Sequence, residues 1–335
     1  MSRIAGIGVY IPERILNNDE LENDFPTWSA AKIFQKTGIR ERRVAAENET
    51  AGDMGVKAAE SLLESESVIR EEIDFLIFCT QAPDYILPTT ACIIQSKLGL
   101  SKECGAFDIN LGCSGYVYGL SIADALINSG SAKNVLLITS DTYSKYINPK
   151  DKSVRTLFGD AAAATFIVAS EGKSAMGPFV FGTDGSGYRN LIVETGMYRE
   201  PRTQESSVVI EDEFGNARSR DDLFMNGSEV LLFSLREVPR SIDEALKRRG
   251  WSIDEVDKFV LHQANSFLIN ALTKKMGVHK DKVPICVEDV GNTVSSSIPL
   301  ALRKLSDSGE ISRGDKIILS GFGVGYSWAS CTLIY

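Results

Sequence analysis

The amino-acid sequence predicts an α/β fold made of two similar halves. Short apolar runs with the length of buried strands occur at residues 75–78 and 135–138. Longer segments with helical periodicity alternate with such runs, as in α/β proteins, and they cover residues 56–64, 116–128, 229–249 and 298–306. Similar short motifs recur in the two parts of the chain, so we expect residues 1–170 and 171–335 to form related halves.

Length, charge and cysteine content set the broad class of the protein. The 335-residue chain is long enough for a large core and carries a formal net charge of −9, which disfavours nonspecific binding to nucleic acid. It has no apolar run of about 18 residues, the length that indicates a membrane span, and residues 1–12 lack the pattern of a signal peptide. The six cysteines form no Cys-x-x-Cys pair, so we expect reduced thiols in the cytoplasm, without a disulfide framework or a metal site.

An internal repeat relates two candidate functional positions. The segment EIDFLIFCTQA of the first half resembles EVDKFVLHQA of the second, and each precedes a predicted helix that ends in Ser-Gly. Counting back 16 residues from Ser129 and from Ser308 reaches Cys113 and Asn292. We therefore expect Cys113 and Asn292 to occupy equivalent helix N-termini that face one central site.

Cys113 lies in the segment Ile109-Asn110-Leu111-Gly112-Cys113-Ser114-Gly115, directly before a predicted helix. The unpaired N–H groups and the dipole of a helix N-terminus favour a thiolate, and the flanking glycines allow a sharp turn. This setting predicts a nucleophile for acyl transfer through a thioester. The alternative is a buried structural cysteine, which most cysteines are.

His262 and Asn292 supply the groups that such a cysteine needs. His262 ends an apolar strand, where an imidazole requires polar partners, whereas the other histidine, His279, lies in a polar turn. We predict that His262 donates to a thioester carbonyl or an enolate, or acts as a base for the thiol; the alternative is a core histidine with satisfied hydrogen bonds. Asn292 is predicted to stabilise an oxyanion through its N–H₂ group, and the alternative is a helix N-cap.

The glycine-rich segment Gly321-Phe322-Gly323-Val324-Gly325 lies between two predicted strands near the end of the sequence. A dinucleotide fingerprint needs a helix and a further βα unit after it, and too few residues follow. A turn whose N–H groups point at the site fits better, so we predict an oxyanion hole made by the N–H groups of Cys113 and Gly323. Residues 171–220 are glycine-rich and polar and are expected to hold the passage between the halves, with a long loop or cap over residues 198–220.

These motifs resemble β-ketoacyl-acyl carrier protein synthase III, a family of thiolase-fold condensing enzymes, and the similarity covers nearly the whole chain. The matching segments are Thr37-Gly38-Ile39-Arg40-Glu41-Arg42, Phe158-Gly159-Asp160-Ala161-Ala162, Leu261-His262-Gln263-Ala264-Asn265, Gly291-Asn292-Thr293 and the glycine-rich turn at 321–325. The resemblance implies a layered α-β-α-β-α core, a homodimer, coenzyme A or acyl carrier protein thioesters as substrates, and no metal or redox cofactor. It implies that Cys113 takes an acyl group, and that His262 and Asn292 then bind a malonyl thioester whose decarboxylation gives the enolate for condensation.

The same resemblance suggests substrate-binding residues and several departures. Lys32, Lys36 and Lys152 stand where the family has a tryptophan and two arginines for coenzyme A, and a lysine cannot stack on adenine as a guanidinium does. The other residues expected to bind substrate are Leu87, in a loop around 83–90 that would cross to the partner subunit, Ser228, Asn265 and Phe322. Lys274 and Lys275 are expected to dock the carrier protein, while Phe267 stands where a basic docking residue is usual.

These departures predict a divergent member whose acyl donor is carried by a carrier protein or is an unusual coenzyme A ester. Three other functions remain open at this level. One is acyl transfer from the cysteine to a hydroxyl or amine without decarboxylation, the second is a Cys–His hydrolase, and the third is a non-enzymatic paralogue. The presence of both His262 and Asn292 favours condensation, because two donors stabilise an enolate.

Overall fold

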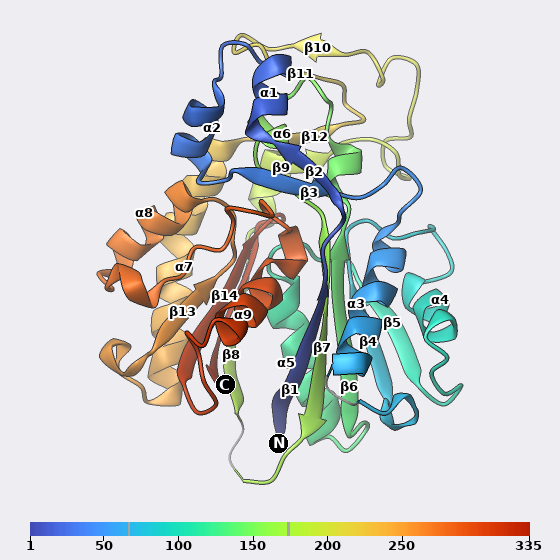
Figure 1. Cartoon of the computed structure of the whole chain (residues 1–335), viewed down its shortest axis with the longest axis vertical. Coiled ribbons are helices and arrows are strands. Elements are labelled where there is room, and N and C mark those ends of the chain that lie inside the picture. The colour runs from blue at the N-terminus through green and yellow to red at the C-terminus, as the bar shows by residue number, and fades with distance from the viewer. Residues whose placement is uncertain (66–67, 173–174) are drawn as a thin grey trace.

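The computed structural model describes residues 1–65, 68–172 and 175–335, and within these residues two mixed sheets form the body of the molecule (Figure 1). The first sheet has the strand order β1-β7-β6-β4-β5, with β1 Ser2–Tyr10, β7 Ala161–Ala169, β6 Asn134–Asp141, β4 Phe75–Cys79 and β5 Gly105–Ile109. The second has the order β13-β14-β15-β8, with β13 Lys258–Leu261, β14 Lys316–Gly323, β15 Ser327–Ile334 and β8 Met176–Thr183.

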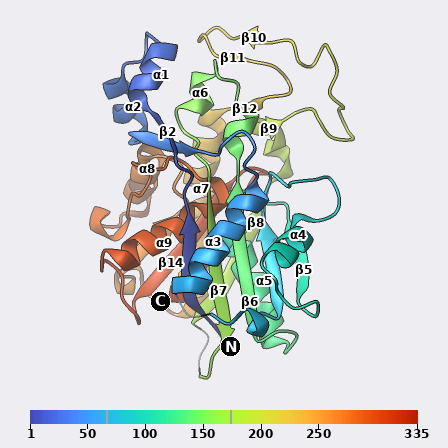
Figure 2. The ribbon, with the colours of Figure 1, turned by 45° about the vertical axis from the view of Figure 1, so that its right-hand side comes forward.

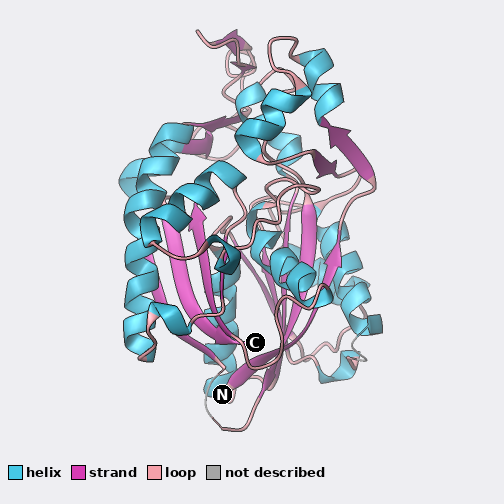
Figure 3. Ribbon diagram, turned by 60° about the vertical axis from the view of Figure 1, so that its left-hand side comes forward, coloured by secondary structure: helices cyan, strands magenta, loops and turns pink. Residues whose placement is uncertain are grey.

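Helices lie between the two sheets and on their outer faces, which gives five layers (Figures 1 and 3). The central layer holds α5 Gly115–Asn128 and α9 Ser297–Asp307. The outer helices are α3 Ala51–Ser65 and α4 Thr90–Lys97 on the first sheet, and α7 Gly227–Arg249 and α8 Ser266–Met276 on the second. The predicted α-β-α-β-α architecture is confirmed. None of the described helices is long and apolar enough to span a membrane.

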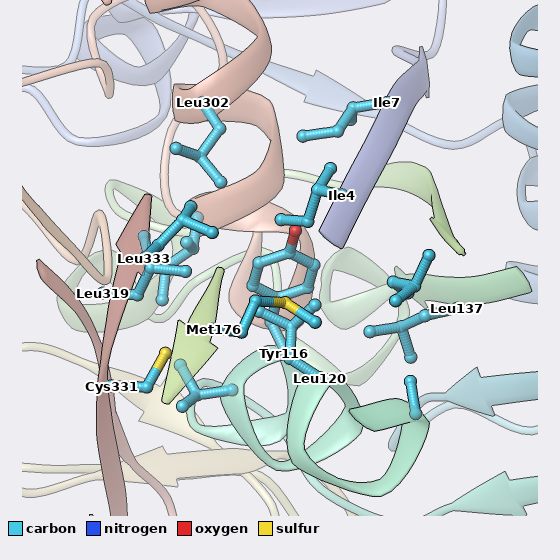
Figure 4. Packing of buried hydrophobic residues seen from close by; sticks show 14 of the residues in the cluster. Ile4, Ile7, Tyr116, Leu120, Leu137, Met176, Leu302, Leu319, Cys331 and Leu333 are labelled. Atoms are coloured by element: carbon cyan, nitrogen blue, oxygen red, sulfur yellow. The ribbon is translucent and has the colours of Figure 1, made fainter. Parts of the chain in front are cut away.

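The central core joins the two halves (Figure 4). Tyr116 and Leu120 of α5 and Leu302 of α9 meet Ile4 of the first sheet and Leu319 of the second, all of them buried. Burial of side chains of this size typically contributes about 1.5–3 kcal/mol each, so the docking of the halves is strongly favoured.

The strand pairings confirm the internal repeat. In the first half β4 pairs in parallel with β6, and β6 pairs antiparallel with β7. In the second half β13 pairs in parallel with β14, and β14 pairs antiparallel with β15. α5 follows β5, and α9 follows the short helix η6 Val294–Ser296, so Cys113 and Asn292 each lie two residues before the first helical residue. The equivalence counted from the sequence is present in three dimensions.

Small residues bring α5 close to the first sheet. A Cβ on Gly119 would lie 2.6 Å from a side-chain carbon of Leu137, and one on Gly115 would lie 2.3 Å from the sulfur of Cys79. Larger residues at these positions would push the helix away from the sheet. The position of Cys113, just before this helix, therefore depends on the glycines of its first turns.

A cap of short elements covers one end of both sheets (Figure 2). It contains α1 Asn18–Asp24, α2 Ala30–Thr37, α6 Lys152–Arg155, β2 Arg14–Asn17, β3 Glu41–Val44, β9 Leu191–Val193, β10 Ile210–Glu211, β11 Ala217–Arg218 and β12 Leu223–Met225. The expected long loop at 198–220 lies here and holds the small β10–β11 pair. Residues 171–220 are more than a passage between halves, however, because β8 is an edge strand of the second sheet, a role that its glycine, proline and mixed polarity concealed.

Candidate active site

A cavity of about 110 Å³ lies beneath the cap, where the carboxyl ends of β13 and β14 approach the start of α5. Carboxyl ends of strands are the usual place for a ligand site in α/β proteins. Its lining is largely apolar but includes the three predicted catalytic side chains, Cys113, His262 and Asn292. The other lining residues are Leu157, Phe158, Leu191, Met225, Gly227, Val230, Leu231, Ala264, Asn265, Phe267, Leu268, Phe322 and Gly323. Cys113 and Asn292 thus share one site, although they lie 179 positions apart in the sequence.

Cys113 packs directly against the second half of the chain. A Cβ on Gly323 would lie 2.8 Å from its sulfur, and one on Gly321 would lie 2.6 Å from its carbonyl oxygen, so both positions require glycine. Burial, followed by the nearby Asp141 carboxylate, raises the pKa of Cys113 to about 12, although the N–H groups of Val324 and of Cys113 itself donate to the sulfur and oppose this rise. The resting group is therefore a thiol, and the expectation of a thiolate favoured by the helix terminus is wrong for the unliganded site, because desolvation outweighs the N–H groups.

The N–H group that reaches the sulfur also differs from the predicted one. β14 continues through Gly323, which pairs with Ser327, and the turn begins only at Val324. The N–H of Val324 therefore approaches the Cys113 sulfur, whereas Gly323 contributes the space beside it. The predicted oxyanion hole of Cys113 and Gly323 stays a prediction, and the N–H of Val324 is a second candidate donor beside Cys113.

His262 follows β13, and its imidazole ring is held by a hydrogen bond and an aromatic contact. Its Nδ1 lies 2.7 Å from Ser297 Oγ, and its ring meets Phe322 edge to face with centroids 5.6 Å apart. Burial lowers the pKa of His262 to about 3, so the imidazole is neutral in the physiological range.

The surroundings of Ser297 assign the tautomer of this neutral ring. Ser297 Oγ accepts the N–H of Gln263 at 3.3 Å, and we assign its own hydroxyl hydrogen to His262 Nδ1. The ring proton is then on Nε2, so the residue can donate a hydrogen bond into the cavity. It is not a base at that nitrogen.

Replacing Ser297 with alanine is expected to slow condensation by about tenfold, because the ring loses the hydrogen bond that fixes its tautomer and orientation. Acylation of Cys113 should change little, since it does not need a donor at Nε2. The two rates are measured by mass spectrometry of the acyl-enzyme and by CO₂ release. Ser296→Ala is the matched control, because Ser296 is equally buried but bonds the carbonyl oxygen of Thr139. Equal effects of the two substitutions would contradict the assignment.

Asn292 is held by the first half of the chain. Its N–H donates to the carbonyl oxygen of Leu157 at 2.9 Å, and its carbonyl oxygen accepts the N–H of Gly159 at 3.0 Å. Its side-chain Oδ1 accepts the N–H of Val294 at 3.0 Å, which orients the carboxamide and leaves Nδ2 as the group available to a ligand. The side chain thus serves as a local cap and still lines the cavity with its donor.

Asp141, at the end of β6, supports the same turn from behind. Its buried carboxylate accepts the N–H and the hydroxyl of Ser295 and, at 2.8 Å, the N–H of Gln81. Burial raises the pKa of Asp141 to about 7, against the lowering effect of these hydrogen bonds. A protonated Asp141 has one acceptor fewer for the turn that carries Asn292.

We therefore expect condensation to lose activity as the pH falls through about 7, the pKa of Asp141, while neutral His262 adds no ionisation there. The sign follows from the raised pKa, since the carboxylate that holds Ser295 is present above this pH and lost below it. Rates of CO₂ release from a malonyl thioester across the pH range test this. Asp141→Asn should be slower throughout and lack this limb; an unchanged limb in the variant would contradict the assignment.

The predicted substrate-binding residues fall into two groups. Asn265 and Phe322 line the cavity. The others do not line it: Lys32, Lys36, Leu87, Lys152 and Ser228. Leu87 is 77% exposed in the single chain.

The three lysines engage other parts of the cap. Lys32 and Lys36 lie over the ring of Trp28, at 5.3 and 5.6 Å from its centroid, and Lys32 Nζ also donates to the carbonyl oxygen of Thr27. Lys152 Nζ donates to the carbonyl oxygen of Phe214, in the turn between β10 and β11. The spacing of Trp28, Lys32 and Lys36, four residues apart each time, is the signal that could have revealed this cluster from sequence.

Val324, Ser297 and Asp141 were not predicted as functional residues. Val324 acts through its backbone and the other two act through residues that they hold, so their residue types carried no signal. Among the described residues, no three His, Cys, Asp or Glu side chains group as metal ligands.

Known proteins resemble this chain over its whole length. Residues 107–185 match the family model of 3-oxoacyl-[acyl-carrier-protein (ACP)] synthase III, and residues 246–335 match its C-terminal model. The β-ketoacyl-[acyl-carrier-protein] synthase III of Xylella fastidiosa (strain 9a5c) is 37% identical over 334 residues, which cover 100% of this chain and 98% of that protein. A 2.1 Å crystal structure of a 3-oxoacyl-(acyl-carrier-protein) synthase III is 52% identical with a TM-score of 0.99, covering 100% and 99% of the two chains. The synthase from Burkholderia xenovorans LB400 is 40% identical with a TM-score of 0.91, covering 99% and 93%.

The shared fold and these full-length similarities define a thiolase-like condensing enzyme, a transferase of fatty acid biosynthesis. Its reaction is the decarboxylative condensation of an acyl thioester with a malonyl thioester, which gives a 3-oxoacyl thioester. The chain belongs to the 3-oxoacyl-[acyl-carrier-protein] synthase III family.

Proposed function

We propose that Cys113, His262 and Asn292 carry the two half-reactions, which makes the enzyme an acyltransferase as well as a synthase. The Cys113 sulfur attacks the carbonyl carbon of the donor thioester in the first half-reaction. The bond from that carbon to the donor sulfur breaks, and the thiol proton ends on the departing sulfur. The products are an acyl-Cys113 thioester and a free donor thiol, and no metal or redox cofactor takes part.

In the second half-reaction, a malonyl thioester occupies the cavity with its carbonyl oxygen at His262 Nε2–H and Asn292 Nδ2–H. Loss of CO₂ leaves an enolate whose oxygen is stabilised by both donors. The enolate carbon attacks the acyl-Cys113 carbonyl, and the N–H groups of Cys113 and Val324 stabilise the tetrahedral oxyanion. Collapse releases the 3-oxoacyl thioester, and the Cys113 sulfur takes up a proton from solvent.

The observation that carries this proposal is that Cys113, His262 and Asn292 line one cavity in which burial keeps the imidazole neutral, and the bond to Ser297 supports our assignment of its proton to Nε2. Two uncharged donors stabilise a developing enolate oxygen without exchanging a proton with it. Intact-protein mass spectrometry tests the first half-reaction, with acyl thioesters as donors and Cys113→Ala as the control. Absence of any label on the wild-type protein would overturn the proposal.

We also propose that the preferred donor is an acyl group on a carrier protein, or an unusual coenzyme A ester, and that acetyl-coenzyme A is a poor donor. The support comes from Lys32 and Lys152, which were expected to bind the nucleotide of coenzyme A. Lys32 instead donates a hydrogen bond to the carbonyl oxygen of Thr27, and Lys152 donates one to that of Phe214. Matched donors decide this, with one acyl group carried on coenzyme A, on carrier protein and on a short pantetheine analogue. Acetylation by acetyl-coenzyme A as fast as by acetyl carrier protein would overturn it.

The carrier protein is proposed to dock on α8 and α2 beside the cavity mouth. Phe267 lines the cavity yet is 61% exposed, and it opens the first turn of α8, whose last turn carries the exposed Lys274 and Lys275. α2 packs against α8 and adds Lys32 and Lys36. This local positive charge on a chain of net charge −9 suits an acidic partner.

Reversing the charge of Lys274 and Lys275 to glutamate is expected to raise the KM for malonyl carrier protein by about tenfold, because the attraction becomes repulsion. The rate with a malonyl pantetheine analogue should stay the same, since it has no protein surface to dock. Lys133→Glu, at the opposite end of β6 from Asp141, is the control. A rise in KM for both substrates would show that the lysines support the fold and do not dock the partner.

The homodimer and the cytoplasmic location are also proposals. The loop at 83–90 exposes Tyr85, Ile86 and Leu87, each more than 60% accessible, and β5 is an edge strand of the first sheet. A second copy of the chain would cover these apolar groups. All six cysteines are free, as suits a reducing compartment.

A further inference from the structure

A buried arginine lies where the cap meets the body of the molecule (Figure 1). Arg42, in β3, is fully buried, and among the described residues its guanidinium donates only to a side-chain amide and to backbone carbonyl groups. Burial, followed by the nearby Arg155 cation, lowers the pKa of Arg42 to about 9, so it stays a cation at neutral pH. A buried cation is destabilising unless its N–H groups meet acceptors, so these acceptors indicate its role.

The guanidinium of Arg42 joins two parts of the cap. Its Nε and Nη2 donate to the carbonyl oxygen of Thr156 at 3.0 and 2.6 Å, and its Nη1 donates to Asn18 Oδ1 at 2.6 Å. Thr156 is the C-cap residue of α6, so the cation satisfies a carbonyl group at a helix C-terminus. Asn18 begins α1 and donates to the carbonyl oxygen of Ile39 at 2.8 Å. Arg42 therefore ties the start of α1 to the end of α6.

The same side chain contacts both strands of the bridge that carries Asn292. Phe158 and Asn292 form this parallel bridge. Thr156, the acceptor of the guanidinium, lies two residues before Phe158. Gly291 comes directly before Asn292, and a Cβ on Gly291 would lie 3.0 Å from Arg42 Cγ. The guanidinium of Arg42 thus holds one strand of the bridge, and its stem packs on the other.

β3 is itself fixed to both strands of the bridge. The N–H of Arg40 donates to the carbonyl oxygen of Glu288 at 2.8 Å, on the side of the second half. The N–H of Asp160 donates to the carbonyl oxygen of Arg43 at 2.7 Å, on the side of the first half. Arg42 lies between these two attachments, so its guanidinium is presented to Thr156 from a rigid position.

We propose that Arg42 is a positioning residue for condensation, which acts through Thr156 and Gly291 on the carboxamide of Asn292. Arg42 does not line the cavity, so its effect on substrate is indirect. Cys113 is placed by α5 and β14, outside this group of contacts, so acylation does not depend on Arg42 in the same way. The inference rests on the proposed role of Asn292 as a donor to the enolate.

Two substitutions of Arg42 test the proposal in the full-length enzyme. Arg42→Met should slow CO₂ release from a malonyl thioester about tenfold, because a small displacement of a catalytic donor is costly. Arg42→Lys keeps the charge and most of the stem but lacks the fork that holds Thr156, and it should lose about threefold. The rate is divided by the amount of Cys113 that an acyl thioester labels, so unfolded protein is not counted. Acylation rates should change less than twofold.

A double-variant experiment separates positioning from general stability. Added to Asn292→Ala, Arg42→Met should cause no further loss of CO₂ release, because the group that it positions is already absent. Arg155→Met is the control, since Arg155 ties Asp24 to the carbonyl oxygen of Pro149 within the cap and bonds neither strand of the bridge. It should release CO₂ at the wild-type rate.

Three results would overturn the inference. They are an unchanged CO₂ release in Arg42→Met, a tenfold further loss when Arg42→Met is added to Asn292→Ala, and an equal loss in Arg155→Met. If Asn292→Ala itself releases CO₂ as fast as the wild-type enzyme, the proposed role of Asn292 fails and the inference falls with it. A slow Asn292→Ala beside a fast Arg42→Met rejects the inference alone.

Discussion

Replacing Cys113 with alanine should abolish formation of the 3-oxoacyl product, by about 10⁴-fold or more, the scale seen when an enzyme loses its nucleophile. No acyl-enzyme can form without the sulfur. Decarboxylation of a malonyl thioester should persist, because the Nε2–H of His262 and the Nδ2–H of Asn292 remain in place on the cavity. The variant should therefore release CO₂ and yield an acetyl thioester, measured by isotope release and by chromatography of the product.

The control for this experiment is Cys92→Ala. Cys92 is an exposed free thiol of α4, so general loss of a cysteine can be distinguished from loss of the nucleophile. This control should match the wild-type protein in acylation and condensation. A Cys113→Ala protein that still carries a thioester-linked acyl group would contradict the assignment of the nucleophile.

Removal of the two enolate donors should have the next largest effect. Each of His262→Ala and Asn292→Ala is expected to slow CO₂ release by about 10²–10³-fold, the usual cost of one donor at an oxyanion. Acylation of Cys113 should fall only a few-fold, because a neutral imidazole protonated at Nε2 does not deprotonate the thiol. Single-turnover acylation and CO₂ release, measured separately, distinguish the two steps.

The double variant adds a further test of shared function. Its loss should be smaller than the product of the two single losses, since both donors bind one oxygen. His279→Ala is the control, because that imidazole is exposed and does not line the cavity. Acylation that falls as far as CO₂ release in His262→Ala would show that the imidazole acts as a base.

The architecture was largely predictable from the sequence, because it follows from periodic features. The runs at 75–78 and 135–138 became β4 and β6, and the spacing back from Ser129 and Ser308 located the helix starts near Cys113 and Asn292. β8 was not predicted as a strand, because an edge strand that covers part of a sheet needs little hydrophobic alternation.

Three features of the site depend on contacts that the local sequence does not contain. Backbone groups carry no residue-specific signal. The N–H of Val324 reaches the Cys113 sulfur because β14 ends at Gly323, and only the pairing with β15 decides where β14 ends. The raised pKa of Cys113 reflects burial by the second half, which the local sequence does not contain. The position of Lys152 depends on Phe214, a residue 62 positions away in a turn of no recognisable motif.

Backbone hydrogen bonds join Asn292 of the second half to Leu157 and Gly159 of the first half. The catalytic arrangement therefore exists only when the two halves are packed together. Neither half holds a complete site, so separate expression of the halves would give no partial catalyst. Mild denaturants or pressure that loosen the contact between the sheets would extinguish turnover while circular dichroism still showed intact helices and strands. Activity in this enzyme is thus an earlier indicator of damage than secondary structure.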